Sequence, residues 1–412
     1  MLPALTAFAR TRWLAHRLRT RTDVARWQAQ RIAKLLKDIR GVPAYAALNA
    51  TALTDLSETD KAMLMADFAA YNRVGITAQE VRAALDAGQD RVRGCPIGQS
   101  TGTSGNRGFY VISEAERFVW LGTILAKALP EILWKRHRVA LALPGFSTLY
   151  RSAEQGRRIA LRFFDLAQGV DSWANDLVAF APDTIVAPPK VLRALAERGQ
   201  LRATSIFSGA EVLDPLDRAV IEAATGAVVR EIYMATEGLF GVSCLRGLLH
   251  LAEDAVHFEW RASGNSGLVT PVITDFTRRT QIMARYRMND LLMLSDAPCP
   301  CGSPLQAVAR IEGRQDDVFE LGGRMVTPDV LRNAVVDADA RITDYRIVQT
   351  GAADVAIYLD PALPVETESS VTTSLEHLFT QLGVTATITH HRGLTVDYDR
   401  KLRRVRRDWR PS

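Results

Sequence analysis

Cysteine is scarce in this chain, with four residues among 412. A scaffold held together by disulfides needs a far higher density of cysteine, so that class of protein is excluded. Long apolar runs are also missing, because the run at 139–146 is much shorter than the roughly 18 to 20 residues that cross a bilayer. The short apolar stretch at 2–9 precedes the N-terminal arginines instead of following them, unlike a secretion signal. We therefore expect a cytoplasmic protein with reduced thiols and no transmembrane helix.

Compositionally biased tracts are absent too, and a hydrophobic content of 47% is typical of a folded protein rather than a disordered one. The net charge of +5 accompanies two arginine-rich stretches, at 10–40 and 400–410. Apolar residues recur at helical spacing in the first stretch, which predicts amphipathic surface helices. The second stretch lacks the interleaved aromatic residues of a nucleic-acid-binding surface, so nucleic acid is not expected as a partner.

The order of elements along the first 313 residues predicts an α/β fold. The first 95 residues have the pattern of helices, including one at 57–68. Short apolar strands then alternate with helices up to about residue 240, which favours a sheet covered by helices. The clearest of these elements are strands at 138–143 and 184–187 and a helix at 189–198. Turn residues punctuate 250–312, where we expect a mainly β layer.

A new unit is predicted after Gly313. Gly322 and Gly323 form a turn signal, and Thr327 precedes a proline as the N-cap of a helix. The predicted elements that complete the unit are strands at 318–321, 345–349, 355–359 and 385–390 and a helix at 366–382. We therefore predict a large N-terminal α/β domain, residues 1–313, followed by a small α+β domain, residues 314–412.

A loop rich in glycine and hydroxyl groups is the strongest local signal. It contains Ser100, Thr101, Gly102, Thr103, Ser104 and Gly105 and continues through Asn106-Arg107-Gly108. Glycines let backbone amides approach phosphate oxygens, and hydroxyls add donors with little bulk. The loop matches neither a Walker loop nor a dinucleotide-binding turn. On its own, it would also fit an ordinary flexible hairpin.

Four further motifs follow that loop in order: Tyr233-Met234-Ala235-Thr236-Glu237-Gly238, Tyr286-Arg287-Met288-Asn289-Asp290, Gly313-Arg314-Gln315-Asp316-Asp317 and Lys401-Leu402-Arg403-Arg404. Together with the loop, they resemble the motifs of the adenylate-forming superfamily, which contains acyl-CoA synthetases and other AMP-binding ligases. The closest resemblance is to phenylacetate-CoA ligases and to the synthetases that adenylylate a deazaflavin coenzyme. Two segments depart from the family pattern. Ser104, Asn106 and Arg107 occupy the stretch of the loop that often carries a second threonine followed by a proline or lysine, and Arg400 stands where a glycine usually precedes the lysine.

The resemblance implies roles at the reacting phosphate. Thr236 would donate to the α-phosphate of ATP, and Glu237 would hold Mg²⁺ among the phosphate oxygens, as suits a hard cation; a surface turn is the alternative. Lys401, on the small domain, would bring a positive charge to the α-phosphate. The arginines around Lys401 leave open a solvated basic tail instead. Asp316 would be the pivot about which a mobile small domain rotates.

The resemblance also implies a nucleoside site. Tyr233 would stack on adenine, Asp290 would accept the two ribose hydroxyls, and Arg314 would reach the ribose from the hinge. A tyrosine in the core and a surface salt bridge are the respective alternatives. The predicted lining of the adenine pocket consists of Ser208, Gly209, Ala210 and Glu211.

Three of the four cysteines and one histidine form a second constellation. They are Cys244, His250, Cys299 and Cys301. Three thiolates and one imidazole are a familiar ligand set for structural zinc, with no open position for catalysis. Small buried residues are the alternative reading. Cys95 has no predicted role.

We therefore expect a ligase that uses ATP and Mg²⁺ to adenylate a carboxylic acid, aromatic or arylacetic by resemblance, and then transfers the acyl group to coenzyme A. A carrier protein and an amine stay open as alternative acceptors. A further alternative is an adenylyltransferase that leaves AMP on the product and needs no thiol, as the deazaflavin-type enzymes do. A basic RNA-binding protein on a degenerate ligase fold is the non-enzyme alternative, and a homodimer stays open. The candidates for the acid pocket are Phe146, Phe207, Ser208, Met234 and Ala235.

Overall fold

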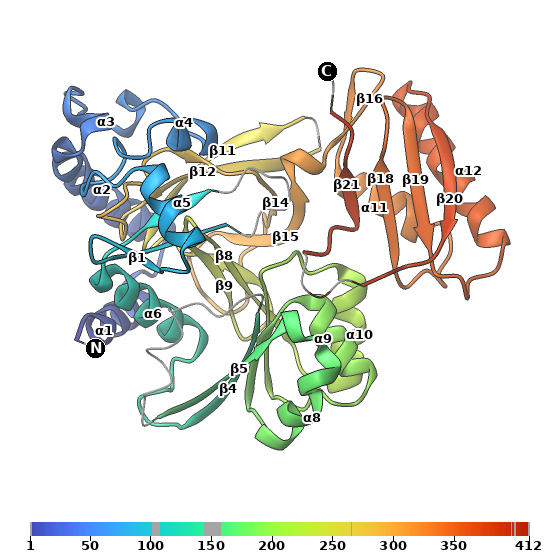
Figure 1. Cartoon of the computed structure of the whole chain (residues 1–412), viewed down its shortest axis with the longest axis horizontal. Helices are drawn as coiled ribbons and strands as arrows, with labels where there is room; N and C mark the ends of the chain where they lie inside the picture. The colour runs from blue at the N-terminus through green and yellow to red at the C-terminus, as the bar shows by residue number, and fades with distance from the viewer. Residues whose placement is uncertain are drawn as a thin grey trace.

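The computed structural model describes residues 2–100, 108–143, 158–264, 266–396, 398 and 401–410. Figure 1 shows a large part that contains the N-terminus and a smaller C-terminal part built from the last strands and helices. The polypeptide passes from one to the other after β15 (Ala307–Arg314), through a 3-10 turn, η4 (Gln315–Asp317). The fold is mixed α/β, with the large sheet and the separate C-terminal α/β unit that the sequence predicts.

Helices dominate the first 90 residues, as expected. Thr20 and Asp23 form a capping box at the start of the second helix, which explains why the long amphipathic stretch is divided there. The helices are α1 (Leu2–Arg17), α2 (Arg21–Asp38), α3 (Pro43–Ala46), α4 (Lys61–Ala66) and α5 (Ala78–Asp86), with 3-10 turns η1 (Ile39–Gly41) and η2 (Leu53–Asp55). Trp13, one of the apolar residues at helical spacing in the stretch 10–40, is 56% exposed.

The helix predicted at 57–68 is shorter than expected. It is reduced to α4, whose N-cap Asp60 accepts a hydrogen bond from the backbone N–H of Met63 at 2.9 Å. Thr59 is held in extended conformation by a β-bridge with Tyr286. The helix cannot begin before that bridge, so the prediction was wrong for its first turn.

A small antiparallel sheet follows, and its last strand leads into α6 (Glu114–Ala128). Ser113 caps this helix in a capping box with Glu116. α6 packs along α1 in the lower left of Figure 1, and Gly122 lies directly against the backbone of Ala4. The strands of the small sheet are β1 (Arg91–Val92), β2 (Cys95–Gln99) and β3 (Phe109–Val111).

The large sheet has a parallel half in which strands alternate with helices. Its order is β5-β4-β6-β7-β8, with every neighbouring pair parallel. All five strands therefore end at the same edge, where ligands bind in doubly wound sheets. The elements are β4 (His137–Leu143), β5 (Ile159–Asp165), η3 (Leu166–Gln168), α8 (Val170–Phe180), β6 (Thr184–Ala187), α9 (Pro189–Glu197), β7 (Ser205–Gly209), α10 (Pro215–Thr225) and β8 (Val229–Ala235).

The same sheet continues as an antiparallel layer, which is the β layer predicted for 250–312. It runs from β9, paired with β8, out to β11 at the far edge. Its strands are β9 (Gly238–Ser243), β10 (Leu249–Leu251), β11 (Val256–Ser263), β12 (Leu268–Asp275), β13 (Tyr286–Arg287), β14 (Asp290–Leu294) and β15. The turn from β8 to β9 therefore lies where the parallel and antiparallel halves meet.

The C-terminal part has a core of its own, which includes Phe319, Leu331, Ile347, Leu375 and Phe379. Its four-stranded sheet has the order β20-β19-β18-β21. Its elements are β16 (Phe319–Leu321), β17 (Arg324–Val326), α11 (Pro328–Val336), β18 (Tyr345–Gln349), β19 (Asp354–Leu359), α12 (Glu366–Leu382), β20 (Thr387–Arg392) and β21 (Val405–Arg407).

Most elements predicted for the C-terminal part have bounds close to those in the structure. β18 and α12 have the predicted bounds, whereas β20 begins two residues later than expected. Thr327 is the N-cap of α11, although its side chain makes no capping hydrogen bond. Among all described residues, no helix is both long enough and apolar enough to cross a membrane.

Candidate functional site

The residues predicted to line the adenine pocket follow β7 at the carboxyl edge of the parallel strands. Ser208 and Gly209 are the last two residues of that strand. Ala210 then adopts a positive φ of 68°, a conformation that is strained for a residue with a side chain and is found preferentially at functional sites. The Ser208 hydroxyl is buried and has no hydrogen-bond partner among the described residues. A buried donor of this kind is suited to a ligand at the end of the strand.

Glu211, the last residue of that segment, is held by a buried ion pair. Its carboxylate lies 2.9 Å from the ammonium of Lys190 on α9, and both side chains are almost fully shielded from solvent. Burial raises the pKa of Glu211, while Lys190 and the backbone N–H of Leu402 act in the opposite direction. The C-terminal part therefore reaches this segment directly, through Leu402.

Tyr233 on β8 joins the predicted ribose-binding residue. Its hydroxyl donates to Asp290 at 2.7 Å, and its ring lies against Phe240 with centroids 5.2 Å apart. Burial raises the pKa of Asp290, although Arg314 and Tyr233 oppose that rise. Arg314 itself lies with Nε 3.8 Å from the Asp290 carboxylate. The two residues predicted to share the ribose are thus neighbours, and stacking of Tyr233 on adenine stays a prediction.

Thr236 and Glu237 form the turn between β8 and β9 and are fixed from several sides. The Thr236 hydroxyl donates to Glu237 at 2.8 Å, and the Tyr286 hydroxyl donates to the same carboxylate at 3.1 Å. Arg278 donates to the backbone carbonyls of both residues, at 2.5 Å and 3.0 Å. The turn is therefore a rigid, braced feature rather than a free surface turn.

Lys401 lies with these groups although it comes from the far end of the chain. Its pKa is lowered chiefly by burial and also by Arg314. Asp290, Glu211 and Glu237 act in the opposite direction, so the ammonium is within electrostatic range of all three carboxylates. The structure thus brings together the charged residues that the motifs predict, and it excludes the picture of a wholly solvated tail at this lysine.

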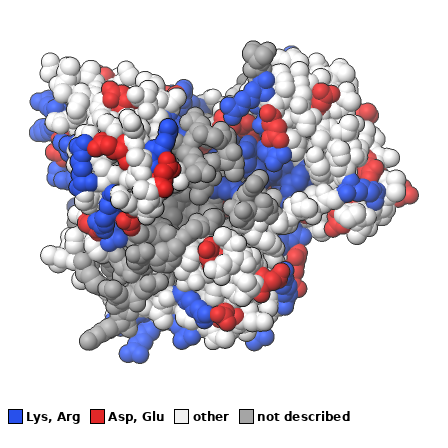
Figure 2. Space-filling model, viewed as in Figure 1, with Lys and Arg blue, Asp and Glu red and all other residues white. Residues whose placement is uncertain are grey.

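The predicted hinge residue, Asp316, is also held in place. Asn289 donates to the carboxylate of Asp316 at 2.8 Å, which connects the turn after β15 to the turn before β14. Asp317 pairs with Arg403, two residues beyond Lys401. Figure 2 shows basic side chains gathered in the hollow between the C-terminal part and the rest of the chain.

Of the predicted phosphate loop, only the first and last residues, Ser100 and Gly108, lie among the described residues. The backbone N–H of Gly108 donates to the Ser100 hydroxyl at 2.9 Å, which closes the base of the loop. The other predicted residues, Thr101, Gly102, Thr103, Ser104 and Gly105, lie outside the described residues, as does Phe146 of the acid pocket.

Sequence reasoning missed several residues of this site. Lys61 has its side chain over Gly108, and Glu237 is among the charges that act on its ammonium, which places a further cation near Gly108 and within electrostatic range of Glu237. Lys190, Arg278 and Tyr286 were missed as supports, because they contact the site across the fold and no local pattern marks them. Tyr286 belongs to one of the motifs named above, and the sequence offered that motif as a signal that Tyr286 lies near Glu237.

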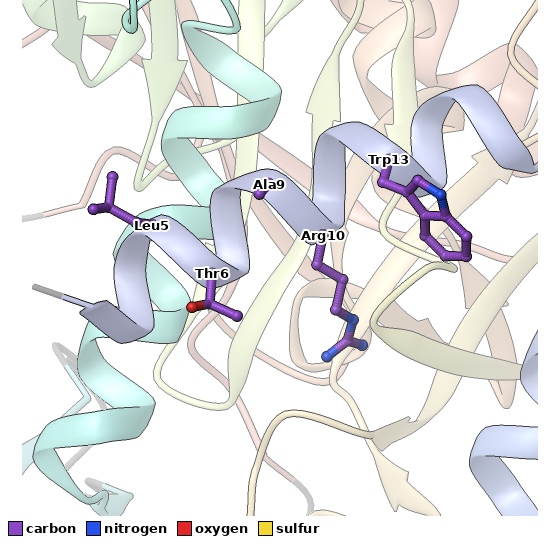
Figure 3. A pocket seen from close by; sticks show the side chains of 5 residues that line it. All are labelled: Leu5, Thr6, Ala9, Arg10 and Trp13. Carbon is purple, nitrogen blue, oxygen red and sulfur yellow. The ribbon is translucent and has the colours of Figure 1, made fainter.

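Phe207 was a candidate for the acid pocket, and that assignment stays a prediction. It is fully buried in the core, with the Arg230 guanidinium 4.3 Å from its ring centroid. Another hollow, about 670 Å³ in volume, lies on the outer face of α1, away from every predicted site residue. Figure 3 shows its lining side chains, which are Leu5, Thr6, Ala9, Arg10 and Trp13.

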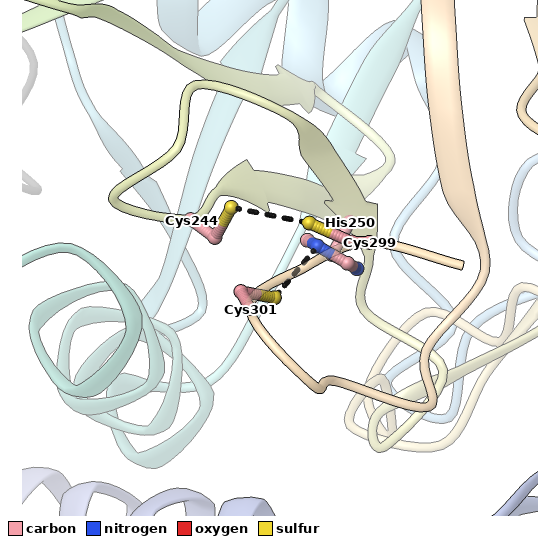
Figure 4. Close-up of side chains that lie close together, drawn as sticks. All are labelled: Cys244, His250, Cys299 and Cys301. Atoms are coloured by element: carbon pink, nitrogen blue, oxygen red, sulfur yellow. Dashed lines mark hydrogen bonds between the residues drawn. The ribbon is translucent and has the colours of Figure 1, made fainter. Parts of the chain in front are cut away.

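The three cysteines and the histidine of the predicted metal site converge. Their four ligand atoms lie within 4.8 Å of one another. The thiols of Cys244 and Cys299 are 3.8 Å apart, and Cys301 lies 3.3 Å from Nε2 of His250 (Figure 4). Bonds of about 2.3 Å to sulfur and 2.0 Å to nitrogen place the ligands of tetrahedral zinc roughly 3.5 to 3.8 Å apart. Nδ1 of His250 lies 3.1 Å from the Leu305 carbonyl, which orients the ring as a second shell would. The four residues therefore fit Zn²⁺.

No family model and no curated protein matches the chain. Solved structures do match, among them a 2-hydroxyisobutyryl-CoA ligase in its postadenylation state with an acyl adenylate. That structure has a TM-score of 0.68 and 18% identity over 92% of this chain and 88% of the ligase. The same ligase in its thioesterification state, with adenylate and CoA, has a TM-score of 0.53 and 19% identity over 93% and 90%. ATP-bound MatB from Rhodopseudomonas palustris matches with a TM-score of 0.56 and 16% identity over 73% of this chain and 64% of MatB. The chain has the fold of the adenylate-forming ligases.

Proposed function

We propose that this protein activates a carboxylic acid with ATP and Mg²⁺, forming an acyl adenylate and pyrophosphate, and then transfers the acyl group to coenzyme A. The observation that carries the proposal is the position of Lys401. A lysine in the segment that leads into β21 lies within electrostatic range of Glu237 and Asp290, which belong to two other motifs in the large part. A fold that served only to bind nucleic acid would have no need to bury this cation among carboxylates.

In the adenylation step, a carboxylate oxygen attacks the α-phosphorus of ATP, and the bond from that phosphorus to the bridging oxygen of pyrophosphate breaks. Two anions approach each other, so the site must supply positive charge and donors. Lys401 and Thr236 are assigned to the α-phosphate, and Lys61, whose side chain lies over Gly108, is assigned to the leaving phosphates. Asp290 and Arg314 are assigned to the ribose, with Tyr233 beside the base.

Glu237 is the proposed Mg²⁺ ligand, and its geometry fits. Its two oxygens accept hydrogen bonds from the hydroxyls of Thr236 and Tyr286, which orient the carboxylate and leave lone pairs for a cation. Bound Mg²⁺ would neutralise charge on the phosphate oxygens. Arg278 donates hydrogen bonds to the backbone of the turn that carries Glu237, and these bonds hold the carboxylate in place for the cation.

The finer assignments rest on resemblance and on the neighbours. We propose an aromatic or arylacetic acid as the substrate, and coenzyme A as acceptor because the neighbouring 2-hydroxyisobutyryl-CoA ligase is described in complex with CoA. We also propose that residues 1–313 and 314–412 act as two domains that rotate about Asp316 between the two steps. Zn²⁺ is proposed at Cys244, His250, Cys299 and Cys301 as a structural ion, since four protein ligands leave no open position.

The test is a panel of carboxylic acids assayed for pyrophosphate release, with and without coenzyme A. At least one acid should release pyrophosphate only with ATP and Mg²⁺, and coenzyme A should convert the adenylate to a thioester. Glu237→Gln keeps the size of the side chain but removes the charge that holds the cation, and it should lower the rate by two orders of magnitude or more. Saturable ATP binding without pyrophosphate release for any acid would contradict the proposal.

A further inference from the structure

The segment that carries Lys401 is fastened to the large part through a buried arginine. Nη1 and Nη2 of Arg404 donate to the two carboxylate oxygens of Asp217 on α10, at 2.7 Å and 2.9 Å. Asp217 is fully buried and Arg404 is 8% exposed at its side chain. A bidentate pair of this kind fixes direction as well as distance. In Figure 1, β21, which begins at the next residue, is the strand of the C-terminal sheet nearest to the rest of the chain.

Each neighbour of Lys401 has its own anchor. The backbone N–H of Leu402 lies near enough to Glu211 to lower the pKa of that carboxyl, and Arg403 pairs with Asp317 in η4. Among these contacts, the two short hydrogen bonds of Arg404 to Asp217 have the best geometry. The backbone carbonyl of Arg404 also accepts a hydrogen bond from the N–H of Ile347 at 2.7 Å, which connects Arg404 to β18. The position of the Lys401 backbone therefore follows from the Asp217 contact, three residues away.

Both ends of this pair keep a counter-charge within their own part of the chain. Asp217 also accepts from Arg193 of α9 at 3.1 Å, and Arg404 also donates to Asp344 at 2.8 Å. Separating a buried ion pair is costly chiefly because each charge is left without a partner. When this pair separates, Asp217 keeps Arg193 and Arg404 keeps Asp344 as a partner. The free-energy cost of opening the contact is therefore far lower than for a buried pair without other partners.

We propose that Asp217 and Arg404 form a reversible latch that positions Lys401 for adenylation and opens for the second step. The inference rests on the proposed function for its chemical meaning, and the latch itself rests on the contacts alone. It agrees with the comparison, because the chain matches the 2-hydroxyisobutyryl-CoA ligase better in its postadenylation state than in its thioesterification state, with TM-scores of 0.68 and 0.53. Asp217 is thus a positioning residue that acts through Lys401 and touches no substrate.

Arg404→Gln and Asp217→Asn each remove one partner of the latch. Because both variants should give the same result, a folding defect in one of them cannot account for it. Arg407→Gln is the matched control, because Arg407 pairs with Glu320 inside the C-terminal part at 3.3 Å. Hydrogen exchange of the backbone gives a readout that needs no substrate. Both latch variants should speed exchange at 402–404 at least tenfold, while the core of the C-terminal part keeps its protection and the control matches the wild type.

The two half-reactions give the second readout. Both latch variants should slow pyrophosphate release about 10- to 100-fold, the range expected for the loss of charge-assisted hydrogen bonds. Thioester formation from a supplied acyl adenylate and coenzyme A should proceed at the wild-type rate or faster. Unchanged exchange at 402–404, or equal slowing of both steps, overturns the latch. A wild type that releases no pyrophosphate overturns the proposed function instead, and the exchange experiment still decides the latch.

Discussion

Replacing Lys401 by methionine removes one positive charge and keeps much of the aliphatic volume. In the structure the ammonium is partly buried and within electrostatic range of Asp290, Glu211 and Glu237, so water cannot replace it fully. Loss of one placed donor at a developing charge typically costs about 10²- to 10³-fold in rate, or about 2.7 to 4 kcal/mol. Lys401→Met should therefore slow pyrophosphate release by this factor.

The pH profile makes the same prediction sharper. Burial lowers the pKa of Lys401 from its ordinary value of 10.5, and adenylation needs the protonated form. The rate of pyrophosphate release should therefore be full at neutral pH and fall as the pH rises through the lowered pKa, at a pH below 10.5. Lys401→Arg should retain part of the rate and lose that fall, because guanidinium stays charged.

Stopped-flow or coupled measurement of pyrophosphate, without coenzyme A, isolates this step. Arg406→Gln is the control for general tail charge, since Arg406 is exposed and pairs with its neighbour Asp408 at 2.8 Å. It should keep the wild-type rate. If Arg406→Gln loses as much activity as Lys401→Met, or if the methionine variant slows transfer from a supplied adenylate equally, the reasoning is refuted.

Three further outcomes are expected. Tyr286→Phe removes a donor to Glu237, so pyrophosphate release should fall about tenfold with a raised requirement for Mg²⁺, and an unchanged Mg²⁺ titration would contradict the assigned role. Elemental analysis should find one zinc per chain, which Cys301→Ser should lose together with thermal stability, whereas Cys95→Ser should lose neither. Gly122→Ala should destabilise the protein by about 1 to 3 kcal/mol in denaturant titrations, because the added methyl would meet backbone of α1 at 2.1 Å; a gain in stability, the usual result inside a helix, would contradict this packing.

Local patterns predicted the fold well wherever one short segment carries the signal. The strand at 184–187 and the helix at 366–382 have the predicted bounds because apolar periodicity and turn residues enclose them. The helix predicted at 57–68 was wrong in its first turn because Thr59 bridges to Tyr286, more than two hundred residues away. Such a bridge leaves no trace in the local sequence.

The residues of the candidate site also fall into those that a local pattern predicts and those that only the folded chain reveals. Thr236, Glu237 and Asp290 were found because they stand in short motifs, and Cys301 with His250 because thiol and imidazole are rare. Trp13 is exposed although it belongs to the apolar residues at helical spacing, because spacing cannot tell whether a neighbouring element covers a given part of a helix face. The hydrogen bonds and ion pairs that hold the site in place were invisible for a similar reason, because each joins elements that only the folded chain brings together.

Arg404 shows what this means for function. In the sequence it is one of several arginines in a basic tail, and charge alone would assign it to solvent or to an anionic partner. In the folded chain its three guanidinium nitrogens are all engaged, two of them with a carboxylate that lies 187 residues earlier. Arg406, two residues later, is exposed and pairs with its neighbour Asp408. Equal charge at nearly equal positions thus predicts opposite results on substitution, and only the depth and partners of each guanidinium decide which arginine governs the placement of Lys401.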